Sequence, residues 1–160
     1  MPFDINFGNK LSDKARVYKR DEEEDFFVQS YQYGTTSHRD GDMNPFAVIY
    51  PGSVEDIKCV VTLAKEKDFG IAVRSGGHQY SGHSSTRGNN VLLDVSDVFE
   101  DFTFPAKEDS NLALVGISLS LEEMNRHLRQ NGLFLPHGQC LHVHLGGHVQ
   151  TGRLNVLTIL

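Results

Sequence analysis

The chain has 160 residues, with 15 Lys and Arg against 21 Asp and Glu and a formal net charge of −6. This length suits one domain or a piece of one, and the acidic balance argues against binding a nucleic-acid backbone through a basic face. No apolar stretch is long enough to cross a bilayer and the N-terminus lacks the apolar core of a signal peptide, so a cytoplasmic protein without membrane contact is the default expectation. Two cysteines, Cys59 and Cys140, do not indicate a disulfide framework.

Residues 1–44 are expected to be a polar segment ahead of the folded domain. The acidic run at 20–27, RDEEEDFF, is expected to be a solvated stretch with no dedicated partner. The first strand is predicted at 46–51, FAVIYP, and it ends at Pro51 because proline has no N–H to donate to a sheet.

A helix is predicted directly after this strand. Ser53 begins a Ser-Val-Glu-Asp sequence typical of a helix N-terminus, and Gly70 is expected to supply the left-handed residue that ends the helix. Cys59 lies beside the apolar stripe of this helix and is interpreted as an ordinary buried thiol. The next strand is predicted at 71–74, IAVR, and leads directly into a glycine-rich stretch.

Two strands and one helix are predicted after the glycine-rich stretch. The strands lie at 89–96 and 112–118, and the helix begins at a capping box formed by Ser120 and Glu123 and ends near 131–132. A loop is predicted after this helix. The order of elements is typical of an α+β fold, a mixed α/β arrangement with helices packed against small sheets.

The glycine-rich stretch at 73–85, VRSGGHQYSGHSS, is the first candidate site. Because Ser75, Gly76 and Gly77 carry little or no side chain, their backbone N–H groups could converge on one anion, and a diphosphate is the natural candidate. The stretch lacks both the G-x-G-x-x-G pattern and the lysine of a P-loop, so it is neither of these nucleotide-binding loops. A tight turn that binds nothing is the alternative interpretation.

Four histidines, His137, His142, His144 and His148, fall within twelve positions. His142 and His144 would lie on the same face of an extended segment, and His148 could complete a three-histidine zinc site. No acidic residue follows close by to orient the imidazoles, and a zinc site leaves the glycine-rich stretch unexplained. Zinc binding is therefore an alternative to the diphosphate hypothesis.

Two segments resemble one known family. The stretch at 73–85 closely resembles the diphosphate loop of vanillyl-alcohol-oxidase-type flavoproteins, the PCMH-type FAD-binding domain, and within them of the berberine-bridge-enzyme-like oxidases. LPHGQCLHVHLGGHVQTG at 135–152 resembles the family's second flavin segment, typically Pro-x-Gly-x-Cys-Pro-Thr-Val-Gly-x-Gly-Gly-His, without a gap. Weaker similarities in the predicted strands and first helix extend the resemblance to about 45–152.

The resemblance implies FAD as the cofactor, with the imidazole of His78 bonded to the 8α-methyl carbon of the flavin. A neutral imidazole nitrogen is the best nucleophile of this loop at neutral pH. Cys140 matches the position at which part of the family forms a second bond, a thioether to flavin C6, which requires the thiolate. His83 matches no attachment position. The residues that the resemblance places against FAD are Arg74, Ser75, Gly76, Gly77, His78, Gln79, Tyr80, Ser81, Gly82, Cys140, Val143, Gly146, Gly147 and His148.

The resemblance also implies a fold and an activity. The fold would be two small lobes of sheet and helix, and the activity a two-electron oxidation of an alcohol, a sugar or a C–H group, with hydride passing to flavin N5. Val143 matches a position at which small side chains tend to admit dioxygen, so an oxidase is expected rather than a dehydrogenase. The partners would be FAD and a small-molecule substrate, and no catalytic base is assigned.

The chain departs from the family pattern at two places. His142 and His144 stand where the pattern has Thr and Gly. At 153–160 the chain reads RLNVLTIL where the family continues with Gly-Gly-Tyr-Gly. Residues 45–152 are therefore expected to be a partial FAD-binding domain with a divergent tail and no substrate domain, and an inactive remnant without cofactor is a further alternative.

Overall fold

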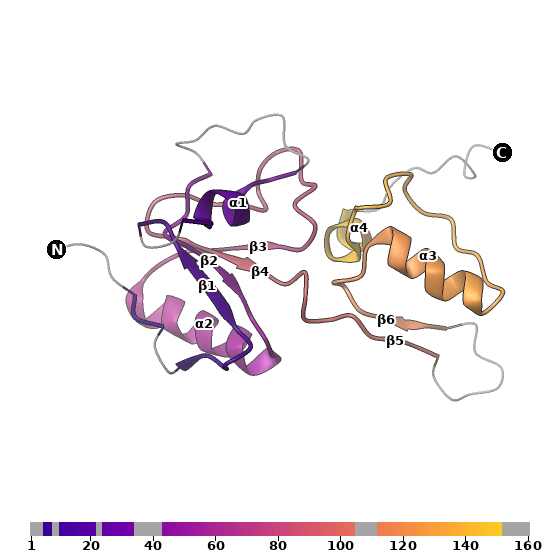
Figure 1. The fold of residues 1–160 in the computed structure, drawn as a ribbon, viewed down its shortest axis with the longest axis horizontal. Helices are drawn as coiled ribbons and strands as arrows, with labels where there is room; N and C mark the ends of the chain where they lie inside the picture. The colour runs from indigo at the N-terminus through magenta and orange to yellow at the C-terminus, as the bar shows by residue number, and fades with distance from the viewer. Residues whose placement is uncertain (1–4, 8–9, 22–23, 34–42, 105–111, 152–160) are drawn as a thin grey trace.

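The computed structural model describes residues 5–7, 10–21, 24–33, 43–104 and 112–151, so the tail expected at 153–160 lies outside the described residues. Figure 1 shows the elements in two groups, which we call the first lobe and the second lobe. The first lobe contains β1 (Arg16–Lys19), α1 (Phe26–Ser30), β2 (Ala47–Tyr50), α2 (Val54–Lys67), β3 (Ile71–Arg74) and β4 (Val91–Asp94). The second lobe contains β5 (Phe102–Thr103), β6 (Leu114–Val115), α3 (Leu121–Gln130) and α4 (Leu145–Thr151). The prediction of a mixed α/β fold with two small sheet-helix lobes is confirmed.

The sheet of the first lobe has the strand order β1-β2-β4-β3. β4 pairs in parallel with both β2 and β3, and β1 pairs antiparallel with β2 at one edge. Side chains of a strand alternate between two faces, so an apolar strand needs cover on both. Leu93 and Ile49 pack with Val60 of α2, while Leu92 packs with Phe26 of α1. The two helices therefore cover opposite faces of the sheet, as Figure 1 shows.

The N-terminal segment contributes two elements to this lobe, β1 and α1, which no sequence pattern indicated. Phe26, near the end of the acidic run at 20–27, is 1% exposed and packs against Val48. The prediction that this run is a solvated stretch ahead of the fold is therefore wrong at its aromatic end. The acidic residues that the structure describes in the run are exposed as expected, namely Asp21, Glu24 and Asp25.

Helix α2 begins as predicted and ends two residues before the predicted stop. The hydroxyl of Ser53 accepts a hydrogen bond from the Asp56 N–H at 3.2 Å, which caps the N-terminus. The left-handed residue at the C-terminus is Asp68, with φ of 55°, and not Gly70. Aspartate tolerates this conformation better than most residues. Gly70 instead donates its N–H to Oδ1 of Asn90 at 2.8 Å, where a Cβ would crowd that side chain.

Helix α3 begins and ends as predicted. The Ser120 hydroxyl accepts from the Glu123 N–H at 3.2 Å, and the Glu123 carboxylate accepts from the Ser120 N–H at 2.8 Å, so the capping box is complete. Gly132 follows the helix with φ of 66°. β6 covers only two residues of the strand predicted at 112–118, and beyond it the N–H groups of Gly116 and Ser118 donate to the carbonyls of Asp101 and Phe99.

Helix α4 lies where the sequence predicted a loop. Its two glycines disfavour a helix by propensity, but tertiary contacts hold it in place. Leu145 is buried in the core of the second lobe with Leu119 and Leu121. The N–H of Leu145 donates to the carbonyl of Leu119, and the N–H of Gly146 donates to that of Ile117, both at 2.9 Å. The first turn of α4 is therefore stabilised by residues that lie far before it in the chain.

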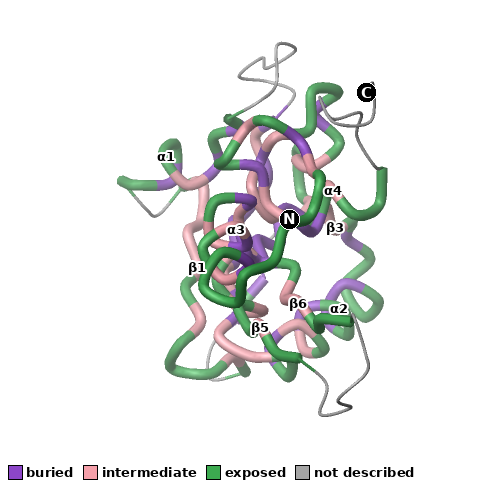
Figure 2. Tube along the Cα trace, turned by 90° about the vertical axis from the view of Figure 1, so that its right-hand side faces the viewer, coloured by how far each residue is buried: buried purple, intermediate pink, exposed green. Residues whose placement is uncertain are grey.

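Buried residues gather toward the centre of the molecule and exposed residues follow its outer turns, as Figure 2 shows. All four residues of β4 are buried, so this strand lies in the interior of the first lobe. No helix among the described residues has the length and apolar character that spanning a membrane requires.

Candidate functional site

The glycine-rich loop begins where β3 ends. Gly77 has a φ of 66°, a left-handed conformation that favours glycine. Within the described parts of the chain, the N–H groups of Ser75, Gly76 and Gly77 make no hydrogen bond. Three consecutive backbone donors are thus available to a ligand, which is the arrangement that binds anions in many proteins.

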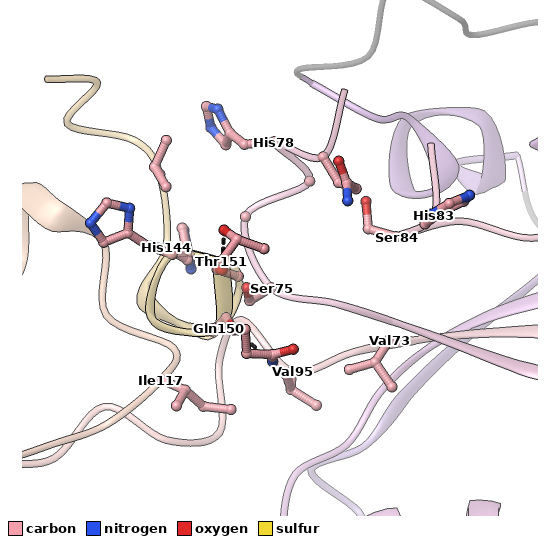
Figure 3. A pocket seen from close by; sticks show the side chains of 17 residues that line it. Val73, Ser75, His78, His83, Ser84, Val95, Ile117, His144, Gln150 and Thr151 are labelled. Carbon is pink, nitrogen blue, oxygen red and sulfur yellow. Dashed lines mark hydrogen bonds between the residues drawn. The ribbon is translucent and has the colours of Figure 1, made fainter. Parts of the chain in front are cut away.

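A second segment reaches this loop from the other lobe. The two segments line a cavity of about 380 Å³, shown in Figure 3, which lies toward the lower end of the volume range typical of ligand pockets. The loop contributes Ser75, Gly76, Gly77, His78 and Gln79. The second segment contributes Val143, Gly146, Gly147 and His148. Nine of the residues predicted from the sequence therefore lie around one cavity.

Two glycines allow the lobes to approach closely beside this cavity. A Cβ on Gly76 would lie 2.7 Å from Cδ2 of His144, and a Cβ on Gly146 would lie 2.8 Å from Oγ of Ser75. Each lobe therefore places a side chain over a glycine of the other. Packing between the lobes therefore favours glycine at both positions, whether or not a ligand also needs the space.

Five residues that the resemblance placed against a flavin do not line the cavity. Tyr80 and Ser81 are exposed, and Gly82 lies in a turn with φ of 76°. Arg74 and Cys140 lie elsewhere in the two lobes, one in the sheet and one against the core of the second lobe.

The guanidinium of Arg74 is bonded within the protein. Arg74 is 5% exposed, and its Nε donates to the carboxylate of Asp94. Its terminal nitrogens donate to the carbonyls of Tyr31 at 2.8 Å and Gln29 at 2.5 Å and to the hydroxyl of Tyr50 at 3.1 Å. Burial and the Asp94 carboxylate raise the pKa of Tyr50, so its hydroxyl stays neutral. Arg74 thus ties the segment after α1 to the sheet.

His78 lies beside that same segment. The ring centroids of His78 and Tyr33 are 4.6 Å apart, with the planes tilted by 43°. Tyr33 follows the residues that Arg74 holds, so the first-lobe sheet and the His78 imidazole are linked through this short segment. No sequence pattern indicated a contact between Tyr33 and the glycine-rich loop.

Both cysteines are free thiols and half-buried. Cys140 packs against the core of the second lobe, and its carbonyl accepts from the N–H of Val143 at 3.2 Å. Cys140 thus lies three residues before Val143, whose side chain lines the cavity. Cys59 packs against the core of the first lobe from α2, which fits an ordinary structural thiol.

The clustered histidines form no metal site within the described ranges, where no group of three or more His, Cys, Asp or Glu is arranged to hold an ion. His142 is exposed, whereas His144 lines the cavity. His137 is bonded to Oδ1 of Asn125 at 2.8 Å and to the carbonyl of Gly138 at 2.6 Å. The geometry gives the zinc alternative no support.

Some residues of the cavity were not predicted. Val73 and Val95 come from the first lobe and Ile117 from the second, and all three are apolar. Gln150 and Thr151 also line it, with their side chains donating to the carbonyls of the glycines in α4, as the dashed lines in Figure 3 show. Their positions depend on a helix that the sequence did not predict. His144 carried a signal, because it departs from the family pattern.

Comparison with known proteins identifies the family. A family model described as an FAD binding domain matches residues 45–156. The FAD-linked oxidoreductase penO of Penicillium crustosum is 32% identical over 112 residues, which are 70% of this chain and 24% of that protein. The glucooligosaccharide oxidase of Sarocladium strictum is 28% identical over 122 residues, covering 74% of this chain and 23% of that protein. The chain spans about a quarter of the length of these relatives.

Solved structures agree with this comparison. The Physcomitrella patens BBE-like 1 structure superimposes with a TM-score of 0.71 and 26% identity, covering 84% of this chain and 28% of that one. A berberine bridge enzyme variant has a TM-score of 0.75 at 23% identity, covering 96% of this chain and 33% of that one, and it supports the fold alone. The chain therefore belongs to the PCMH-type FAD binding domain family, whose matched members are FAD-linked, berberine-bridge-enzyme-like oxidoreductases.

Proposed function

We propose that FAD binds in the cavity between the lobes, with its diphosphate against the N–H groups of Ser75, Gly76 and Gly77. The chain would act as the flavin-binding part of an oxidoreductase. One observation carries this proposal: the two flavin-like segments, about seventy positions apart, line the same cavity. Gly146, Gly147 and His148 would contact the cofactor from the second lobe.

The residues present suit a diphosphate. Three backbone donors at the loop are unbonded within the described structure, and no Asp or Glu is among the described residues that line the cavity. An anion there would meet N–H groups and imidazoles and no opposing carboxylate. The absence of bulky side chains at Gly76 and Gly77 lets a ligand approach the main chain.

We further propose covalent attachment of the flavin through His78, with a second bond through Cys140. His78 lies at the cavity, and the Tyr33 ring beside it restricts the orientation of its imidazole. Neutral imidazole can act as the attacking nucleophile. The bond at Cys140 would require its thiolate and a short movement toward the cavity, since the thiol packs against the second-lobe core.

When bound, the flavin would supply two-electron chemistry, accepting hydride from an alcohol, a sugar or a C–H group of a small substrate. This chain's own residues would bind the cofactor, orient it and exclude water from one side. Val143 is 8% exposed and lines the cavity. A side chain of this modest size would leave room for dioxygen, which supports an oxidase over a dehydrogenase.

Acid precipitation of the purified chain tests the proposal. The protein should be yellow, and the colour should stay in the pellet because the flavin is bonded to the protein. His78→Ala should leave in the pellet only flavin bonded through Cys140, and His78→Ala combined with Cys140→Ser should release all flavin into the supernatant. His83→Ala, a change in an exposed histidine of the same loop, should leave the colour in the pellet. Cys140→Ser should leave the bond through His78 intact.

Two results would contradict the proposal at different levels. Flavin in the supernatant of the wild-type chain would remove covalent attachment and leave FAD binding. A colourless protein whose melting temperature does not change with added FAD would remove FAD binding and favour an inactive remnant.

A further inference from the structure

The cavity contains no permanently charged side chain. Among the described residues that line it there is no Lys, Arg, Asp or Glu, and the titratable groups are the imidazoles of His78, His83, His144 and His148. Every cationic charge that a bound anion could meet on these side chains therefore comes from a protonated histidine.

His144 differs from the other three because it stands where the family pattern has glycine. It pairs with Ser120 in an isolated bridge, and its ring lies against Gly76, the central residue of the glycine-rich loop. Figure 3 shows His144 on the second-lobe side of the cavity, facing the loop that carries His78. The imidazole is thus next to the backbone donors proposed to hold the diphosphate.

One ring nitrogen of His144 has no hydrogen-bond partner within the described structure. This atom, Nδ1, is buried. Buried polar nitrogens are normally bonded, so an unbonded one beside a cavity indicates that a ligand or water completes it.

We infer that His144 is a protonation-dependent contact for the diphosphate of the ligand. As imidazolium, it would donate a hydrogen bond to a phosphate oxygen and add a positive charge beside the backbone donors of the loop. Binding would therefore tighten as the pH falls through the neutral range. This inference rests on the proposed binding of FAD in the same cavity.

The charged and titratable groups around His144 come from α3, from α4 and from the glycine-rich loop. Glu123 of α3 carries the nearby carboxylate, fixed by the hydroxyl and N–H of Ser120. Those two hydrogen bonds lower the pKa of Glu123 against the effect of burial, and the charge of His144 and of Arg126 lowers it further. Glu123 therefore stays ionised through the neutral range. His78 and His83 on the first-lobe side and His148 of α4 would oppose the charge of His144 when they are protonated.

The test measures binding of ADP-ribose and of FAD to the full chain, produced in riboflavin-starved cells, at about pH 6 and about pH 8. ADP-ribose carries the diphosphate without the flavin ring and cannot become attached through His78. The diphosphate of both probes has no group that titrates in this range, so a change in affinity reports on the protein. We expect affinity for both probes to rise roughly five- to tenfold at the lower pH.

His144→Gln keeps a hydrogen-bonding side chain that does not titrate, and it should remove most of this pH dependence. His142→Gln is the matched control, because His142 is exposed, two residues away and not part of the cavity lining. It should retain the full dependence. His144→Gly, which restores the family residue, should behave like His144→Gln if the charge, and not the packing of the ring, is responsible.

The outcomes separate the inference from the proposed function. If neither probe binds the wild-type chain at either pH, the proposed function fails. If both bind but His144→Gln keeps the wild-type pH dependence, the inference is overturned and another imidazole carries the charge. Equal affinity of the wild-type chain at both pH values would also overturn it.

Discussion

Arg74 and Asp94 form a buried ion pair at the ends of β3 and β4, with side chains 5% and 3% exposed. Three further hydrogen bonds from the guanidinium and one from the Ser96 N–H to the Asp94 carboxylate satisfy the pair. Because both charges lose their hydration, such a pair contributes little net stability to the fold. Removing one partner, however, leaves the other charge buried and uncompensated.

Arg74→Met should therefore lower the free energy of unfolding by about 3–5 kcal/mol. Arg74→Met combined with Asp94→Asn should recover part of that loss, because the double variant buries no unpaired charge. Urea denaturation followed by circular dichroism measures both effects. The exposed pair of Arg16 and Asp97 provides the control, since Arg16→Met should cost less than about 1 kcal/mol. Similar losses for Arg74→Met and Arg16→Met would contradict the role given to the buried pair.

For single residues, the sequence indicated which residues line the cavity better than it indicated which protein groups they contact. The accessible main chain at Gly76 and Gly77 could be predicted, because glycine is used mainly where the backbone needs an unusual conformation or a close approach. Arg74 was expected to contact the cofactor. Two of its four protein partners, the carbonyls of Gln29 and Tyr31, lie more than forty positions earlier, and no local pattern encodes them. The packing of His144 on Gly76 is equally nonlocal.

Asp56 connects helix α2 to the segment that precedes β1. It is 2% exposed, and its carboxylate accepts hydrogen bonds from the N–H of Ser12 and of Gly52 and from the hydroxyls of Ser12 and Ser53, at 2.7 to 3.0 Å. Burial alone would raise the pKa of Asp56, but these hydrogen bonds outweigh it and the pKa is lowered.

The pKa of Asp56 is lower in the folded chain than in the unfolded chain, where it is about 4. Ionised Asp56 therefore stabilises the fold at any pH above the unfolded-state pKa, and this contribution is lost as the pH falls through the folded-state pKa. Asp56→Asn should reduce the free energy of unfolding by about 1–3 kcal/mol at neutral pH. The difference from the wild-type chain should shrink toward about pH 3.

Urea titrations of the two proteins at several pH values measure that difference. Glu55→Gln is a suitable control, because Glu55 is exposed in the same helical turn and its ion-pair partner among the described residues is the exposed Lys58. It should change stability little at any pH. A penalty for Asp56→Asn that is as large at low pH as at neutral pH would exclude the charge as its cause.

Elements that local chemistry specifies were predicted well. The caps at Ser53 and Ser120 are local signals, and both helices begin there. Helix α4 was missed because its first turn depends on the carbonyls of Ile117 and Leu119. β1 was missed because a short polar edge strand has no strong period of its own and acquires its structure from pairing with β2.

The whole molecule depends on how the two lobes are joined, because the cavity has walls from both. Sequence resemblance predicted that two segments share one ligand, but not which apolar residues close the space between them. Val95 lies where the chain leaves the first lobe, Ile117 belongs to the second lobe, and both residues line the cavity. Their positions follow from the junction of the lobes, which arises only when the chain folds.

Ser118 is a central part of that junction. It is 2% exposed, its hydroxyl donates to the carbonyl of Val95 at 2.5 Å, and the same oxygen accepts from the N–H of Phe99 at 2.8 Å. One side chain of the second lobe thus fixes two backbone groups of the segment that leaves the first lobe.

Ser118→Ala should reduce the free energy of unfolding by about 1–3 kcal/mol, because it leaves those two backbone groups without their partner. The N–H of Phe99 should lose protection in hydrogen exchange, and FAD affinity should fall because the walls of the cavity are no longer held together. Ser96→Ala, which removes a hydroxyl bonded to exposed Asp97, should change none of these. If Ser118→Ala weakened the fold but left FAD affinity and the exchange of Phe99 unchanged, the junction would not determine the geometry of the cavity.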